Sequence, residues 1–81
     1  MHDLTDAERA MLALERSTFI HRGVKERVIR DRFDMTSTRY HQLLLALLDR
    51  PEAMAYDPVT VRRLRRLRDQ RRRGRLSRAA G

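Results

Sequence analysis

The chain has 81 residues, a formal net charge of +8 and no cysteine. A chain this short buries only about 60% of the surface that its unfolded form exposes, so we expect one small core, and the lack of cysteine excludes a disulfide framework. No apolar run approaches the roughly 20 residues that cross a bilayer, and the first residues do not resemble a signal peptide. We therefore expect a cytoplasmic protein without a membrane partner.

The positive charge is concentrated at the C-terminal end of the chain. Residues 1–57 contain nine Arg or Lys and ten Asp or Glu, whereas residues 58–81 contain ten arginines and one acid, Asp69. Such a cluster is typical of a segment that binds a polyanion, and the planar guanidinium of arginine forms paired hydrogen bonds with phosphate. We therefore divide the chain into a core over residues 1–56 and an arginine-rich helix and tail over residues 57–81.

The first helix is predicted to begin at Thr5. Thr5 and Glu8 have the spacing of a capping box, and Leu4 precedes them at the position of a hydrophobic staple. Gly23 is expected to end this helix near residue 22. The residues that recur at helical spacing along it are Ala7, Met11, Leu14, Thr18 and Phe19.

Two further helices are predicted, separated by a polar turn. The second begins near Val24 and carries Val28, Ile29 and Phe33 on its apolar side. Residues 34–37 favour a turn, because Asp, Thr and Ser prefer caps and turns to helix interiors. The third helix, over residues 36–48, has the clearest pattern, an apolar face made of Tyr40, Leu43, Leu44, Leu47 and Leu48.

The C-terminal part is predicted to contain one extra helical turn over residues 51–56 and a last helix. Asp57 is a good N-cap for that last helix, and Pro58 follows at its first position. Val61, Leu64 and Leu67 form a narrow apolar stripe among the arginines, and from residue 71 onward we expect the helix to fray unless a ligand orders it. The predicted fold is all-α, a three-helix helix-turn-helix core followed by an arginine-rich helix.

The helix-turn-helix pattern makes the third helix a candidate for reading DNA in the major groove, where Leu45 would contact a thymine methyl group. The phosphate backbone is expected to bind the arginines of the last helix. The candidate base-contacting residues are Ser37, Thr38, Arg39, His41 and Gln42. The candidate phosphate-contacting residues are Arg62, Arg63, Arg65, Arg66, Arg71, Arg72 and Arg73.

Residues 29–44 resemble the helix-turn-helix of sigma-factor region 4 and of related response-regulator output domains. Ile29 and Phe33 match the supporting helix, and Met35, Tyr40 and Leu44 match the apolar positions of the motif. This resemblance implies DNA binding in transcription. The chain departs from the motif at Arg30, Asp34 and Tyr40, and of these Asp34 replaces the usual turn glycine with a residue that tolerates a left-handed backbone.

Nearly the whole chain also resembles a family of small, helical, largely uncharacterised proteins from actinobacteria and their phages. The matching segments are Glu15 with Arg16, Met35 with residues 38–40, residues 49–53 and residues 63–68. This resemblance implies a helical, intracellular protein and supplies no activity.

Enzymatic activity is not expected. The sequence has no P-loop, no glycine-rich nucleotide motif, no cysteine nucleophile and no metal-ligand cluster, and His2, His21 and His41 lack the spacing of a zinc site, so no metal or cofactor is predicted. Glu8, Glu15 and Glu26 are interpreted as helix caps and ion-pair partners.

We therefore expect a nucleoid-associated regulator that binds double-stranded DNA. One recognition helix reads only a few base pairs, so selectivity requires a homodimer, RNA polymerase or another transcription protein. Two alternatives remain open at this point. In the first, the chain is a protein-interaction module, such as a polymerase or sigma-factor adaptor or a phage-type inhibitor of a host protein. In the second, its arginine-rich tail binds structured RNA.

Overall fold

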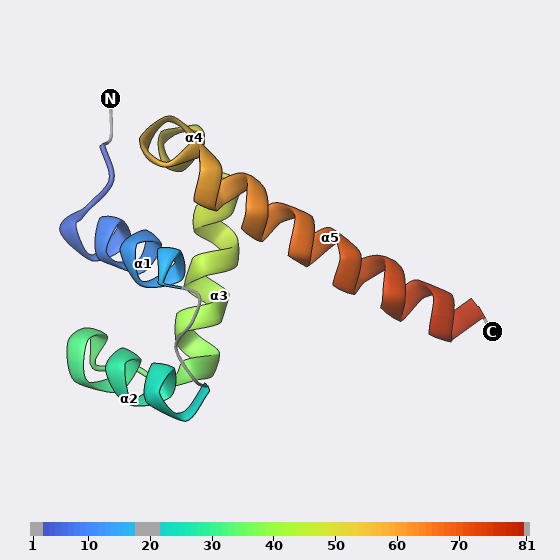
Figure 1. The fold of residues 1–81 in the computed structure, drawn as a ribbon, viewed down its shortest axis with the longest axis horizontal. Helices are drawn as coiled ribbons and strands as arrows, with labels where there is room; N and C mark the ends of the chain where they lie inside the picture. Colours follow the sequence, from blue (N-terminus) through green and yellow to red (C-terminus); the bar gives the residue numbers. More distant parts are fainter. Residues whose placement is uncertain (1–2, 18–21, 81) are drawn as a thin grey trace.

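The computed structural model describes residues 3–17 and 22–80, and this part of the chain is all-helical, as the sequence predicted. Its five helices are α1 (Asp6–Arg16), α2 (Arg22–Phe33), α3 (Ser37–Leu48), α4 (Pro51–Tyr56) and α5 (Pro58–Ala80). Figure 1 shows α1, α2 and the lower part of α3 grouped together, while α5 crosses the top of α3 and then runs away from the other helices. No helix of the described part is long and apolar enough to span a membrane.

The start of α1 has the predicted capping box. The Glu8 amide donates to Thr5 Oγ1 at 3.1 Å and the Thr5 amide donates to Glu8 Oε1 at 2.7 Å. The backbone hydrogen bond from Thr5, together with hydrogen bonds from Arg50 and the Thr5 hydroxyl, holds the pKa of Glu8 below its ordinary value although partial burial opposes this. Leu4, at the staple position, is buried.

The predicted end of the first helix was wrong. The helix α1 ends at Arg16, and the amide of Ser17, its C-cap, donates to the Leu14 carbonyl. Gly23 lies in the first turn of α2, and since no described glycine has a positive φ, it does not form the left-handed cap that the prediction assumed. Thr18 and Phe19, which were assigned to the apolar side of the first helix, lie outside the described residues.

The turn between α2 and α3 follows the prediction. Asp34 has a φ of 52°, the left-handed conformation expected at the position of the usual glycine, and its amide donates to the Arg30 carbonyl at the end of α2. Thr36 then caps α3 by accepting a hydrogen bond from the Arg39 amide at 3.1 Å.

All five helices contribute to one hydrophobic core. The predicted apolar face of α3 is confirmed: Tyr40, Leu44, Leu47 and Leu48 are buried, and Leu43 packs partly buried against the core. The other buried apolar residues are Leu4 before α1, Met11, Leu12 and Leu14 of α1, Ile29 of α2, Ala53 of α4 and Val61 of α5.

The last helix begins as predicted but continues further than expected. The Asp57 carboxylate accepts a hydrogen bond from the Thr60 amide at 3.2 Å, and the helix runs to Ala80, so the predicted fraying from residue 71 onward was wrong. Arg, Gln, Leu and Ala are good helix formers, and a helix already nucleated by a packed first half adds further turns at little cost. The absence of an apolar stripe therefore did not end this helix.

Candidate nucleic-acid interface

The exposed side of α3 carries three of the five residues that the sequence assigned to base contacts. Thr38, Arg39 and Gln42 are all solvent-exposed; Thr38 and Gln42 lie opposite the buried face of α3, and Arg39 lies on its flank. The turn at Asp34 and the cap at Thr36 fix where this side begins. These three residues are called the α3 polar stripe below.

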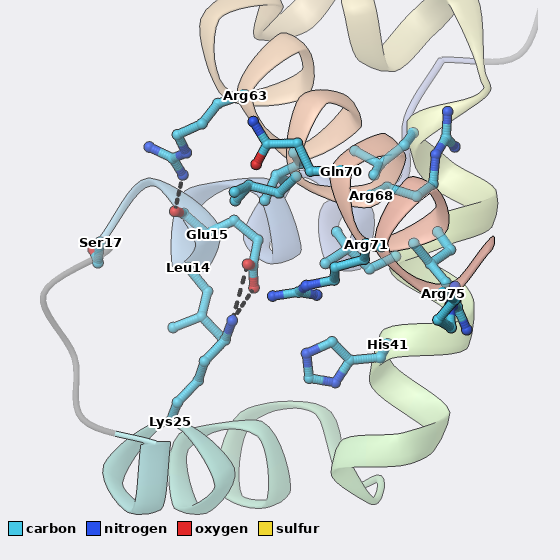
Figure 2. A pocket seen from close by; sticks show the side chains of 16 residues that line it. Leu14, Glu15, Ser17, Lys25, His41, Arg63, Arg68, Gln70, Arg71 and Arg75 are labelled. Atoms are coloured by element: carbon cyan, nitrogen blue, oxygen red, sulfur yellow. Dashed lines mark hydrogen bonds and ion pairs between the residues drawn. The ribbon is translucent and has the colours of Figure 1, made fainter. Parts of the chain in front are cut away.

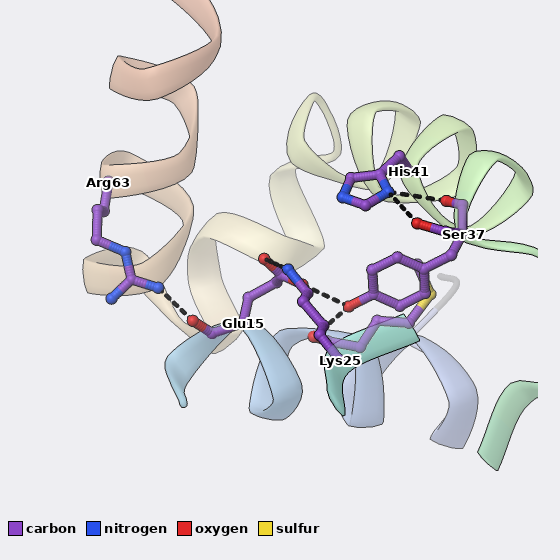
Figure 3. Close-up of polar contacts among 7 residues, drawn as sticks. Glu15, Lys25, Ser37, His41 and Arg63 are labelled. Atoms are coloured by element: carbon purple, nitrogen blue, oxygen red, sulfur yellow. Dashed lines mark hydrogen bonds and ion pairs between the residues drawn. The ribbon is translucent and has the colours of Figure 1, made fainter. Parts of the chain in front are cut away.

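The other two predicted base-contacting residues, Ser37 and His41, contact each other. The Nδ1 atom of His41 lies 2.8 Å from the Ser37 carbonyl oxygen, one turn earlier in the helix, and Ser37 is half-buried (Figure 3). The His41 ring also packs edge-on against the Tyr40 ring, with ring centroids 5.5 Å apart. His41 is therefore exposed but oriented toward α5, away from the α3 polar stripe.

Two of the predicted phosphate-binding arginines are used inside the protein. The Arg63 guanidinium donates to the carbonyl oxygen of Glu15 in α1, and Arg65 Nε donates to the carbonyl oxygen of Leu48 in α3 at 2.7 Å. Both contacts satisfy carbonyl groups near the C-terminal end of a helix, where cationic side chains are favourable. Sequence reasoning missed this role, because the partners lie 48 and 17 residues away along the chain.

The remaining arginines of α5 that were assigned to phosphate, namely Arg62, Arg66, Arg71, Arg72 and Arg73, are exposed. None of these five side chains makes a hydrogen bond or ion pair within the part of the chain that the structure describes. Their charges are therefore available to a polyanion.

A cationic cluster lies at the C-terminal end of α3. Arg68 pairs with Asp49 at 2.9 Å, and this hydrogen bond, followed by the charges of Arg68, Arg65 and Arg72, lowers the pKa of Asp49. Asp49 follows Gln42 and Leu45 on the same side of the helix at helical spacing. Arg65, Arg68 and Arg72 of α5 therefore lie near the end of the line of residues that begins at Gln42.

A groove of about 900 Å³ lies between α3 and α5, and Leu14 and Glu15 of α1 and Lys25 of α2 also line it (Figure 2). Leu44, Leu45 and Leu48 form its α3 side, and Leu64 and Leu67 form its α5 side. Arg71 and Arg75 lie further along α5 at the same groove. We call this feature the α3/α5 groove.

A buried polar cluster joins α1, α2 and α3 (Figure 3). The Tyr40 hydroxyl donates to Glu15 Oε2 at 2.6 Å and lies 3.3 Å from the Met11 carbonyl oxygen. Lys25 Nζ pairs with both Glu15 oxygens at 2.8 and 2.9 Å and lies 5.9 Å from the centre of the Tyr40 ring. Burial, the hydrogen bond to Glu15 and the Glu15 charge raise the pKa of Tyr40 above its ordinary range.

Sequence reasoning predicted an ion-pair role for Glu15 and a core position for Tyr40, but not their contact. Glu15 follows Met11 by four residues and therefore lies on the apolar side of α1. A carboxylate on an apolar face is the signal that a buried partner exists. No group of three or more His, Cys, Asp or Glu side chains in the described residues is arranged to hold a metal ion.

The fold, the α3 polar stripe and the α3/α5 groove define the class of protein. It is all-helical, with a helix-turn-helix unit made by α2 and α3 and a long cationic helix, α5, packed against it. The chain belongs to DUF3263, a family described as "Protein of unknown function", whose model matches residues 3–76. The match therefore includes all of α1 to α4 and most of α5. No curated protein and no solved structure matched the chain.

Proposed function

We propose that this protein is a DNA-binding regulator of transcription in which α3 enters the major groove and the exposed arginines of α5 contact phosphates. The observation that carries the proposal is the α3 polar stripe, which is exposed on the second helix of a helix-turn-helix unit. This is the position from which helix-turn-helix proteins present side chains to base edges. The resemblance of residues 29–44 to sigma-factor region 4 supports the same assignment.

The side chains of the stripe have the chemistry that base reading requires. The Arg39 guanidinium can donate to the two acceptors of guanine, and the Gln42 amide can pair with the donor and acceptor of adenine. The Thr38 hydroxyl can bond to a donor or to an acceptor on a base edge. His41 and Ser37 are less suited, because each already bonds to the other within α3. We therefore assign sequence preference mainly to Arg39 and Gln42.

Affinity in this proposal comes from α5. Arg72 is near Asp49 at the end of α3, and Arg62, Arg66 and Arg73 are exposed along the same helix. If four such arginines contact phosphates, the slope of log K against log salt is about −3.6, and binding weakens by about two orders of magnitude between 50 and 200 mM salt. Arg63 and Arg65 contribute little to this slope, because their guanidinium groups are held by backbone carbonyls.

The proposed partners are double-stranded DNA and, for selectivity, a second copy of the chain, RNA polymerase or another transcription protein. One α3 helix covers only a few base pairs, which is too short a site to be distinctive in a genome. The proposed location is the cytoplasmic nucleoid.

The test compares Arg39→Ala with Arg72→Ala in gel-shift titrations on genomic fragments and on random duplex DNA at about 50 and 200 mM salt. The two variants are matched, because each removes one exposed arginine from a helix. We expect Arg39→Ala to reduce the preference for the best fragment by about 1–3 kcal/mol. Arg72→Ala is expected to weaken both DNAs equally and to reduce the salt slope by about 1.

Equal losses on specific and random DNA for both variants would show that the division between reading and phosphate contact is wrong. Wild-type protein that binds no duplex DNA at low salt would end the proposal. Competition with structured RNA at the same salt identifies the RNA alternative, since RNA would then displace DNA from the wild-type protein.

A further inference from the structure

We infer that the α3/α5 groove is a docking site for an acidic amphipathic helix of a partner protein. The inference goes beyond DNA binding. It shares Leu45 and Arg71 with the candidate DNA contacts, and its other residues are different. None of Thr38, Arg39 and Gln42 lines the groove, although Leu45, which follows Gln42 on the same side of α3, does.

Leucines of α3 and α5 form the apolar part of the groove, and two of them are only partly covered. Leu45 of α3 is 47% exposed and Leu67 of α5 is 40% exposed, although both line the same groove. Leu44 and Leu48, beside Leu45, are buried in the core, so the apolar surface continues from the core into the groove. A helix with leucine-type residues every three to four positions would cover both exposed leucines in one contact.

The charge of the groove identifies the chemistry of the partner. Most of its cations are already held within the protein: Lys25 by Glu15, Arg63 by the Glu15 carbonyl and Arg68 by Asp49. Arg71 and Arg75 have no such partner among the described residues, and both line the groove (Figure 2).

Arg71 and Arg75 lie one helical turn apart on α5. Two carboxylates one turn apart on a docked helix have the same spacing and would pair with both guanidinium groups. A second copy of this chain fits less well, because it would bring arginines against arginines. The occupant is therefore an acidic helix rather than another copy of this chain.

Residues 69–75 of α5 form no hydrogen bond or ion pair with another helix in the described part of the chain. Figure 1 shows this part of α5 extending away from α1 and α2. A helix seated in the groove would contact α5 along this segment and α3 at the same time.

The probe is a synthetic acidic amphipathic peptide with leucines at helical spacing and two glutamates four residues apart. A scrambled peptide of the same composition and a peptide with lysine in place of glutamate are the controls. Binding to the full chain is measured by fluorescence anisotropy at physiological salt. We expect saturable binding of the acidic peptide alone.

Three variants locate the contact. Leu67→Gln and Arg71→Glu are each expected to weaken peptide binding by at least about tenfold, because each removes part of the groove surface. Arg62→Glu is the matched control, with the same change of charge at an exposed position of α5 that does not line the groove, and it should change affinity by less than about twofold. Circular dichroism confirms that all three fold.

Several results would overturn the inference. Equal binding of the scrambled peptide, no binding of the acidic peptide, or an equal effect of Arg62→Glu and Arg71→Glu would each do so. A dimer in light scattering that Leu67→Gln dissociates would assign the groove to a second copy instead. Loss of duplex DNA binding in Leu67→Gln would assign the groove to DNA, whereas failure of the DNA assays with intact peptide binding would leave this inference standing.

Discussion

The hydroxyl of Tyr40 gives the sharpest test of how the helices are held together. The side chain is fully buried, and its hydroxyl donates to the Glu15 carboxylate at 2.6 Å. Tyr40→Phe removes one oxygen atom and leaves the ring in place against Phe33, whose ring centroid lies 5.5 Å away. After the change, Glu15 loses the Tyr40 hydroxyl and keeps Lys25 as its side-chain partner among the described residues.

The expected cost follows from the charge and burial of Glu15, whose exposure is 7%. Hydrogen bonds to charged groups contribute about 1.5–3 kcal/mol, and a buried acceptor that loses its donor costs the full value. A chain of this length has a free energy of unfolding of roughly 4–12 kcal/mol, so the loss is a large fraction of it. The corresponding fall in Tm is roughly 10 °C.

The assay is urea and thermal unfolding followed by circular dichroism. Tyr56→Phe is the matched control, because it removes the same atom from a half-exposed tyrosine that makes no hydrogen bond in the described part of the chain, and it should cost less than about 0.5 kcal/mol. A double-mutant cycle with Glu15→Gln should give a coupling of about 0.5–3 kcal/mol. If Tyr40→Phe lowered the free energy of unfolding no more than Tyr56→Phe does, the conclusion that the buried cluster holds the helices together would be refuted.

Three further outcomes are expected from the same structure. Burial would by itself raise the pKa of Asp57, but hydrogen bonds from Arg16 and Thr60 lower it. The stability that the Asp57 carboxylate contributes is therefore present above the ordinary pKa of 3.8 and is lost as the pH falls through the lower folded value. In urea titrations from pH 6 to 2, Asp57→Asn should lose less stability at low pH than the wild type, and an equal loss would contradict this. The pKa of Tyr40 is raised, so the free energy of unfolding should fall as the pH rises above 10.0, and this fall should be smaller in Tyr40→Phe. Gly74→Ala should raise helix content and stability by up to about 1 kcal/mol, because a Cβ there meets no atom within 4 Å, and a decrease would show that α5 is not helical at this point.

The sequence alone determined the features that depend on residues three or four positions apart. The capping box of Thr5 and Glu8, the apolar face of α3, the left-handed Asp34 and the start of α5 after Asp57 were all predicted and found. Each depends on residues that lie within one or a few helical turns of one another, so its signal is present in a short segment of the sequence.

The predictions from local sequence pattern were wrong where one segment was compatible with two structures. Gly23 was taken as the end of the first helix, but glycine also tolerates the first turn of a helix, and the structure places it there. The polar segment from residue 71 onward was expected to fray, but most of its residues are good helix formers and follow an already formed helix, so that even Gly74 does not end it. In both cases the local signal was compatible with two structures.

Only the tertiary structure decided which charged residues are available to a partner. Ten arginines in the last 24 residues look equivalent in the sequence, yet Arg63 and Arg65 bond to carbonyls of α1 and α3, whereas Arg71 and Arg72 remain exposed. The same holds for the contact between Glu15 and Tyr40, which lie 25 residues apart. Such pairings depend on how whole helices cross, and helix crossing is set by the packing of the entire core rather than by any short segment.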